Sequence, residues 1–347
     1  MALINVHEHL QSGREAPKLL HAMDETGIDR IVIVGSSAFT ITGNYRYGFT
    51  KYDENNREII DVARAHPDRV EAWPTIDPLD PDKLDKFRSH HELGATGLKL
   101  YLGHGYVNPD SGDYLFGPIA MDHPSMDPVY EYCASQRLPV CLHINPGPNT
   151  PGFADEFIAT LERHPKLLVN APHWILSSVR PSRLSELLDV FPNLVTDVSF
   201  GVDEFLIAGL RRISRNPLRV RRVVEQYPDR FLFGTDFVVT SAHHKTSDWI
   251  RMRIETYFKM LISKEYETPL LPSEVLNGLD LPASIFERIG SSNYLEFRAP
   301  DRQLASPARS VEWPRLGIPR PNRASGERLR YQAPPETVIA TETRSSC

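Results

Sequence analysis

Short apolar runs rich in β-branched residues recur from the N-terminus to about residue 240, and each is followed by a stretch with helical spacing. In the segment 181–192, for example, Leu184, Leu187, Leu188 and Phe191 fall on one face of an α-helix. The runs that we predict as strands cover residues 3–9, 30–36, 70–76, 96–102, 138–144, 166–173, 193–200 and 230–237. Eight alternations of strand and helix predict an α/β fold, a closed parallel (β/α)8 TIM barrel with its helices outside.

Three of the predicted strands are followed by unusually long connections, at residues 36–56, 103–128 and 238–249. Long loops in a compact domain are commonly functional or disordered. In a parallel barrel all three would lie at the carboxyl ends of the strands, which is the face that carries the active site in this architecture.

The periodicity ends at about residue 298, where the sequence becomes rich in proline, arginine and serine. We therefore divide the chain into a barrel, residues 1–297, and an extended Pro/Arg-rich C-terminal tail, residues 298–347. The tail has too few apolar residues to form a core of its own. It is either a disordered appendage or an arm that packs on the barrel or on a partner subunit, and we expect the arm, anchored by Trp313, Leu316, Ile318 and Tyr331.

Length, charge and cysteine content exclude several classes of protein. The 347 residues suffice for one large barrel, and the net charge of −6 gives no sign of a nucleic-acid-binding surface. We find no apolar run long enough to span a membrane and no secretion signal. The three cysteines have no framework spacing, which fits a reducing compartment, so we expect a cytoplasmic protein.

Residues capable of binding a metal stand at the carboxyl ends of five predicted strands. They are His7 and His9 on the first strand, Lys99 on the fourth, His143 on the fifth, His173 on the sixth and Asp236 on the eighth. A single histidine at a strand end is commonly a hydrogen-bonded core residue. Because strand ends of a barrel converge on one mouth, the whole set favours a metal site. Imidazole and carboxylate ligands suit Zn²⁺, and also Mn²⁺, Fe²⁺ or Co²⁺.

Five motifs, in the order "VHEHL", "GATGLKLY", "PVCLHINPG", "VNAPH" and "RFLFGTDF", resemble the metal-dependent amidohydrolase superfamily and, within it, the amidohydrolase 2 branch. The resemblance extends from residue 1 to about residue 297. It implies one divalent metal, with Zn²⁺ the expected ion, held by His7, His9, His143 and Asp236. It further implies that Asp236 accepts a proton, and that His173 binds or polarises the substrate.

The sequence departs from the pattern of the branch after the sixth strand. The branch often has a small residue there, but Trp174 directly follows His173. Trp174 would narrow the pocket or form an apolar wall for an aromatic substrate.

In binuclear relatives the lysine of the fourth strand is carboxylated and bridges two metals. We favour a single metal, with Lys99 paired to an acidic side chain or to an anionic substrate. The other substrate contacts that we predict are Tyr101, Asn145 and His244.

The resemblance implies a hydrolase in which a metal-activated water attacks an amide, lactone or ester carbonyl and Asp236 shuttles the proton. The alternative is a metal-dependent decarboxylase, a carbon–carbon lyase, acting on an aromatic or unsaturated carboxylic acid, because members of the branch use the same metal ligands for that reaction. A non-catalytic binding barrel is a third possibility.

We expect a small-molecule substrate, no nucleic-acid or membrane partner, and a homo-oligomer, in the simplest case a dimer. The aromatic residues after the second strand either suit a ring-bearing substrate or pack on the barrel. They are Tyr45, Tyr47, Phe49 and Tyr52.

Overall fold

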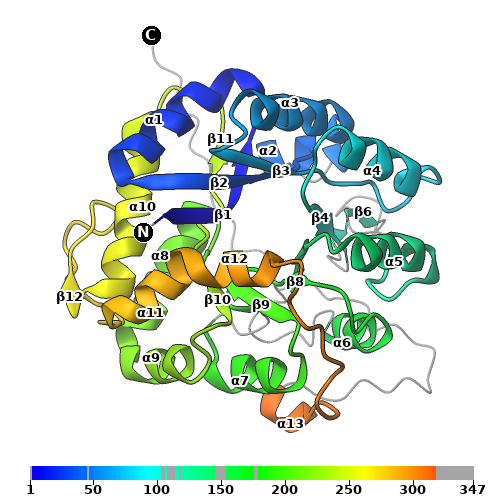
Figure 1. The fold of residues 1–347 in the computed structure, drawn as a ribbon. Coiled ribbons are helices and arrows are strands. Elements are labelled where there is room, and N and C mark those ends of the chain that lie inside the picture. The colour runs from blue at the N-terminus through cyan, green and yellow to red at the C-terminus, as the bar shows by residue number, and fades with distance from the viewer. Residues whose placement is uncertain are drawn as a thin grey trace.

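Parallel strands close into a barrel ringed by helices in the computed structural model, which describes residues 2–44, 47–102, 106–107, 114–116, 119–144, 154–175 and 179–317 (Figure 1). The barrel strands are β1 (Leu3–Leu10), β2 (Ile28–Val34), β3 (Val70–Trp73), β4 (Leu98–Tyr101), β7 (Val140–His143), β8 (Val169–Asn170), β9 (Leu194–Asp197), and β10 (Phe231–Leu232) with β11 (Val238–Val239). Each lies within, or within two residues of, a predicted strand, and the predicted TIM barrel is confirmed.

Two seams join the hydrogen-bonded sheets β11-β1-β2-β3 and β10-β9-β8-β7-β4 into a closed ring. At the first seam, Thr75 and Lys99 form a parallel bridge just beyond β3. At the second seam, the Val6 N–H donates to the Phe233 carbonyl over 2.8 Å. The second seam therefore brings the first and the last strand of the barrel together.

The last barrel strand is broken in two, whereas the sequence predicted one strand over 230–237. β10 pairs with β9, and β11 pairs with β1. Between them Asp236 adopts a left-handed conformation with φ 57°. The N–H groups of Thr235 and Asp236 both donate to the His7 carbonyl, over 3.3 and 2.7 Å. A turn anchored on β1, and not the pleat of a strand, therefore aims the Asp236 side chain.

A β-bulge in β1 decides which side chains face the barrel mouth. The register runs from Asn5 opposite Ile31 to Glu8 opposite Ile33, so β1 contains one extra residue. Ile4 and Val6 pack inside the barrel, and strict alternation from Val6 would turn His7 and His9 outward. The extra residue reverses the alternation, and both histidines therefore reach the mouth.

An apolar core fills the barrel below the mouth. Its members come from most of the strands and include Val6, Val34, Trp73, Val195 and Leu232. The helix α12 (Asn293–Arg298) lies across the end of the barrel and adds Tyr294 and Phe297 to this core (Figure 1). Because this end is closed by side chains, the functional groups are confined to the opposite, carboxyl end of the strands.

Helices bury a second apolar layer against the outside of the barrel. They are α1 (Ala16–Thr26), α3 (Tyr52–Ala65), α4 (Lys83–Glu92), α5 (Asp127–Gln136), α6 (Ala154–Arg163), α7 (Pro181–Val190), α8 (Asp203–Arg215), α9 (Pro217–Gln226), α10 (Ser247–Ile262) and α11 (Ala283–Glu287). The short helix α2 (Ala38–Thr42) follows β2 and has no buried residue. The hairpins β5–β6 (Tyr106–Val107, Tyr114–Phe116) and β12–β13 (Glu265–Tyr266, Leu276–Asn277) lie outside the barrel sheets. In the described segments, no helix has both the length and the apolar character needed to cross a membrane.

Residues 299–317, which we call the C-terminal strap, run from α12 back over α7 and end in the short helix α13 (Trp313–Leu316) (Figure 1). The Ala308 N–H donates to the Val190 carbonyl over 2.8 Å, and Leu316 is fully buried. Arg309 Nη1 and Nη2 donate to the two carboxylate oxygens of the buried Glu186, over 2.7 and 2.9 Å. Two expected anchors of the tail, Ile318 and Tyr331, lie outside the described residues.

We predict that Glu186→Gln loosens the C-terminal strap. Burial raises the pKa of Glu186, but the hydrogen bonds from Arg309 outweigh it, so the pKa lies below its usual range. The carboxylate therefore stabilises the strap above about pH 4.5 and less as the pH falls through the lowered pKa. Loss of hydrogen bonds to a charged group costs about 1.5–3 kcal/mol, so hydrogen exchange at the Ala308 amide should accelerate by roughly 10- to 100-fold at pH 7.

The exposed Glu204 on α8 offers a matched control, because Glu204→Gln should leave this exchange rate unchanged. The difference between Glu186→Gln and the unmodified protein should also shrink at low pH. Equal exchange rates in the two proteins at pH 7 would contradict the assignment of Glu186 as the anchor of the strap.

Candidate metal centre

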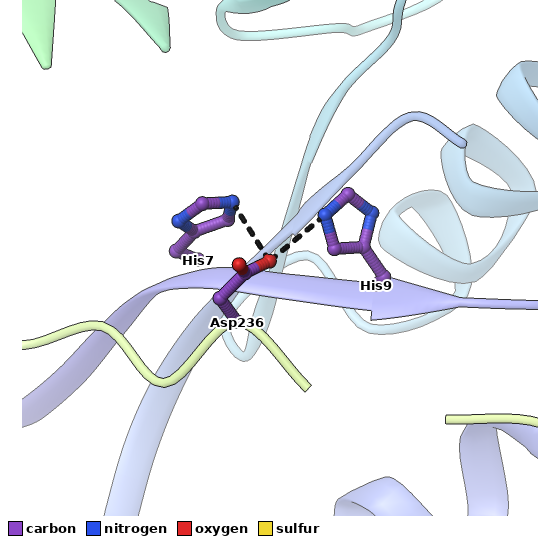
Figure 2. Close-up of side chains that lie close together, drawn as sticks. All are labelled: His7, His9 and Asp236. Atoms are coloured by element: carbon purple, nitrogen blue, oxygen red, sulfur yellow. Dashed lines mark ion pairs between the residues drawn. The ribbon is translucent and has the colours of Figure 1, made fainter. Parts of the chain in front are cut away.

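Three side chains converge at the mouth of the barrel, His7 and His9 from β1 and Asp236 from the turn between β10 and β11 (Figure 2). Asp236 Oδ1 lies 3.2 Å from His7 Nε2 and 3.0 Å from His9 Nε2. One ligand atom from each residue lies within 4.8 Å of the other two. The histidines are almost completely buried, and the Asp236 side chain is 13% exposed.

The spacing and chemistry of these donors fit a divalent metal. Two ligands of a tetrahedral Zn²⁺ with bonds of about 2.0–2.1 Å lie roughly 3.3 Å apart, close to the distances that separate Asp236 Oδ1 from the two imidazoles. Burial lowers the pKa of His9 to about 4, against the opposing effect of Asp236, so its imidazole is neutral at pH 7, as a metal ligand must be. Burial opposes ionisation of Asp236 as well, but the adjacent histidines hold its pKa well below the usual range.

A second carboxylate, Asp197 at the end of β9, lies behind His7. Its Oδ2 accepts from His7 Nδ1 over 2.9 Å and from Asn170 Nδ2 over 3.1 Å. Burial alone would raise the pKa of Asp197, but its interaction with His7 holds it well below the usual range. A carboxylate that orients a metal-ligating histidine through its second nitrogen is common in metalloproteins.

His173 occupies a strained turn directly after β8. The residues His173, Trp174 and Ile175 have φ values of 61°, 59° and 56°, a conformation that costs of order 1–3 kcal/mol for each residue. Their N–H groups bond to β9, at Asp197 Oδ1 (3.4 Å), the Asp197 carbonyl (3.2 Å) and Thr196 Oγ1 (3.1 Å). The turn places His173 Nε2 at 3.4 Å from Asp236 Oδ2.

His143 and Tyr101 lie beside this group at the mouth. The His143 ring is 4.9 Å from that of His173 and 5.8 Å from that of Tyr101. Tyr101 in turn places its hydroxyl 3.4 Å from His9 Nε2. Among the described residues, the close ligand group contains His7, His9 and Asp236 without His143, so ligation by His143 stays a prediction.

Lys99 is buried at the end of β4 and faces the same group. Its Nζ lies 3.0 Å from His7 Nε2 and 3.4 Å from Cys141 Sγ. In the described part of the chain, no carboxylate forms an ion pair with this ammonium. The structure therefore places a buried cation beside the candidate metal ligands.

Two predicted substrate contacts do not reach the buried cluster, and a third cannot be placed. Trp174 is fully buried and packs on Phe200 and Phe231, with centroid distances of 6.2 and 5.5 Å, because the left-handed turn sends its side chain into the layer beneath the helices. His244 is exposed and packs edge-on against His243. Asn145 lies outside the described residues.

The aromatic residues after β2 pack against one another. The Phe49 and Tyr52 rings meet edge-on at 6.4 Å, and Phe49 forms a small cluster with Tyr101. Tyr47 is half exposed, and Tyr45 lies outside the described residues. This cluster flanks the mouth through Tyr101.

Sequence reasoning missed Asp197 and Glu8, although the pattern held a signal for each. Asp197 is an acid inside the apolar run "NLVTDVSF", at the same level as the residues that end the other strands. Glu8 lies between the two histidines in the sequence and is buried, and its Oε2 accepts hydrogen bonds from Asn5 Nδ2 over 3.2 Å and from the hydroxyl of Thr235, the residue before Asp236. Both carboxylates therefore hold parts of the site in place.

Gly234 permits the close approach of β10 to these groups. A Cβ at position 234 would lie 3.0 Å from both Cβ and Cγ of Asp197 and 3.1 Å from His7 Cβ. A larger residue would therefore displace the side chains that build the site.

Comparisons with known proteins identify a family and a fold. A family model described as "Amidohydrolase" matches residues 11–293, a range that contains His143, His173 and Asp236 and begins just after His9. No curated protein sequence matches the chain.

Solved structures share the fold. A probable 2-pyrone-4,6-dicarboxylic acid hydrolase from Acinetobacter baumannii, with citric acid bound, has a TM-score of 0.56 at 14% identity and covers 86% of this chain and 99% of its own. An uncharacterized TIM-barrel protein from Bordetella bronchiseptica gives 0.55 at 15% identity, with 86% and 99% covered. The 5-carboxyvanillate decarboxylase from Sphingomonas paucimobilis gives 0.52 at 14% identity, with 85% and 98% covered.

We predict that His7→Ala combined with His9→Ala abolishes stoichiometric binding of a divalent metal, because two of the three converging donors are removed. Metal content after dialysis, measured by plasma mass spectrometry, checks this. The double variant His243→Ala with His244→Ala is the matched control, since it removes two exposed neighbouring histidines, and it should retain a full equivalent. A full equivalent in the His7 and His9 variant would show that the site is wrongly assigned.

Proposed function

This chain belongs to the amidohydrolase family, and we propose that it is a metal-dependent hydrolase that cleaves an amide, lactone or ester of a small anionic molecule. His7, His9 and Asp236 would hold one divalent metal, for which Zn²⁺ is the expected ion and His143 the expected fourth ligand. When bound, such a metal lowers the pKa of a water from 15.7 to about 7 and polarises a carbonyl oxygen.

The observation that carries the proposal is the division of the Asp236 carboxylate between two kinds of neighbour. Its Oδ1 faces the imidazoles of His7 and His9, and its Oδ2 faces His173 Nε2 at 3.4 Å. The pKa of Asp236 lies well below its usual range, so the group is a carboxylate at neutral pH and can accept a proton. Oδ2 can then pass that proton to His173.

His173 would act on the substrate through its Nε2. His173 Nδ1 carries a proton when it donates to the Ser199 hydroxyl, over 2.9 Å. In the neutral imidazole Nε2 is then unprotonated. Nε2 must therefore receive a proton before it can donate to a carbonyl oxygen or to a leaving group. A single positioned donor of this kind stabilises an oxyanion by about 3 kcal/mol.

Lys99 supports an anionic substrate and is the observation that favours the second candidate, a decarboxylase. A buried ammonium without an ion-paired acid in the described residues is costly, and a substrate carboxylate would offset that cost. Decarboxylation requires such a carboxylate, whereas hydrolysis is compatible with one. Two structural neighbours have names that describe a dicarboxylic acid hydrolase and a carboxyvanillate decarboxylase, so the shared fold does not decide between the reactions.

We predict that Asp236→Asn lowers kcat by at least about 100-fold while the protein retains much of its metal. The substitution keeps the size of the side chain and removes its basicity, and a positioned acid–base group contributes about 10²–10⁴-fold. Turnover and metal content are measured on the same sample, with the exposed Asp248→Asn as control. Full metal with near-normal kcat would rule out the proton transfer, and activity restored by excess metal would show that Asp236 is a ligand alone.

The reaction class is tested by turnover in H₂¹⁸O of a panel of lactones, amides and aromatic or unsaturated acids. We expect one ¹⁸O atom in the product for each turnover, because hydrolysis adds water to the carbonyl carbon. Release of CO₂ without this label would establish the decarboxylase instead, and absence of turnover over the whole panel by metal-loaded protein would favour a binding barrel.

We predict that Lys99→Met raises KM at least about 10-fold for carboxylated substrates and much less for neutral analogues, as expected for a lost hydrogen bond to a charged group. Metal content is measured alongside, because Lys99 contacts His7. An equal effect on charged and neutral substrates would contradict this role.

The expected dimer and the cytoplasmic location stay predictions.

A further inference from the structure

The Asp197 carboxylate is fully buried and is the acceptor of five hydrogen bonds at the base of the site. Oδ2 accepts from His7 Nδ1 and Asn170 Nδ2. Oδ1 accepts from the Ser199 hydroxyl, the Ser199 N–H (3.1 Å) and the His173 N–H (3.4 Å). Oδ2 therefore contacts the His7 imidazole directly, and Oδ1 is connected to the His173 imidazole through the Ser199 hydroxyl.

The hydrogen bonds of His7 define which nitrogen carries its proton. Asp197 is an ionised acceptor on the Nδ1 side, at 2.9 Å. On the other side, Lys99 Nζ lies 3.0 Å from Nε2, and an ammonium group can only donate. Both contacts place the proton of the neutral imidazole on Nδ1, so Nε2 is unprotonated and accepts from Lys99 in the absence of an ion.

The same reasoning applies to His173 through Ser199. The Ser199 hydroxyl has one proton, which it donates to Asp197 Oδ1. It must therefore accept at its contact with His173 Nδ1, over 2.9 Å, and the Ser199 carbonyl offers Nδ1 a second acceptor at 3.4 Å. His173 consequently carries a proton on Nδ1, and its Nε2 lies 3.4 Å from Asp236 Oδ2, the oxygen with which it can exchange a proton.

We propose that Asp197, with Ser199 as relay, is the positioning residue that sets the tautomer of both His7 and His173. Through these two branches one carboxylate orients the two imidazoles, so that Nε2 of His7 lies beside Asp236 Oδ1 and Nε2 of His173 lies beside Asp236 Oδ2. The inference deepens the proposed function and rests on it, because it treats His7 Nε2 as a metal ligand and His173 as the group that meets the substrate.

A purely structural role for Asp197 is the competing explanation, because Oδ1 also accepts the two backbone N–H groups of Ser199 and His173. The two explanations differ for Ser199→Ala. This substitution removes the relay to the His173 imidazole and leaves both backbone bonds and the His7 branch intact. A structural role therefore predicts no change in either imidazole, whereas the positioning role predicts a change in His173 alone.

The test uses the full-length protein with ¹⁵N-labelled histidine, studied by NMR without metal, together with competition measurements of Zn²⁺ affinity. In the unmodified protein, His7 and His173 should both show the Nδ1–H tautomer. Ser199→Ala should shift His173 toward the Nε2–H tautomer, leave His7 unchanged and alter Zn²⁺ affinity by less than about twofold. Asp197→Asn should disturb both imidazoles and weaken Zn²⁺ binding by about 10- to 100-fold, the usual effect of losing a partner of a metal ligand.

Two further variants make the test independent of the folding of Asp197→Asn. Gly234→Ala places a Cβ against Asp197 and His7 without removing a polar atom, and it should perturb the His7 signals and weaken Zn²⁺ binding. Glu186→Gln removes a buried carboxylate that binds Arg309 of the C-terminal strap and none of the site residues, and it should change neither measurement.

Unchanged tautomers in both Ser199→Ala and Asp197→Asn would overturn the proposal. So would a loss of Zn²⁺ affinity in Ser199→Ala as large as that in Asp197→Asn. If the unmodified protein bound no metal, the proposed function would fail, while the spectra of the metal-free proteins would still decide whether Asp197 sets the tautomers.

Discussion

The arrangement of the mouth depends on a single buried carboxylate. Asp197 accepts hydrogen bonds from β1 through His7, from β8 through Asn170 and from the turn after β8 through His173. Its donors are two side-chain nitrogens, of His7 and Asn170, together with the Ser199 hydroxyl and two backbone N–H groups. The pKa of Asp197 is well below the usual range. A buried charge of this kind is tolerated only where every lone pair is satisfied. The need to satisfy Asp197 therefore fixes the positions of β1 and β8 relative to β9, the strand that carries it.

Strained backbone accompanies the functional side chains. His173 and Asp236, which face each other, both have positive φ values, and neither is glycine. The cost of these conformations is offset by hydrogen bonds from their own N–H groups, to Asp197 in one case and to the His7 carbonyl in the other. The same few residues of β1 and β9 thus support the chain on both sides of the site.

The barrel could be predicted from the sequence because strand–helix alternation and apolar periodicity are local properties, and segments such as 181–192 contain them in full. The five strand-end positions could be predicted for the same reason. The bulge in β1 and the break in the last strand could not, because both depend on hydrogen-bond register with a partner strand. Trp174 was expected at the pocket since nothing in the sequence near it indicates a left-handed turn.

Asp197 was missed for a different reason. The histidine that it orients, His7, is 190 positions away along the chain, and the nearby Ser199 does not by itself mark an aspartate in an apolar run as part of a site. The acid is informative only after the strands have been placed side by side. Residues that support other residues are in general harder to find from one sequence than residues that meet a ligand.

The seam between β1 and the last strand has a consequence for assembly. The donors at the candidate metal centre come from opposite ends of the barrel sequence, and the carbonyl of His7 itself binds the turn that carries Asp236. An ion held by these donors would link β1 to the last strand across the seam. A ligand that binds only the folded state stabilises that state. Closure of the barrel and binding of the ion would therefore be thermodynamically coupled, and a barrel open at this seam would not bind the ion.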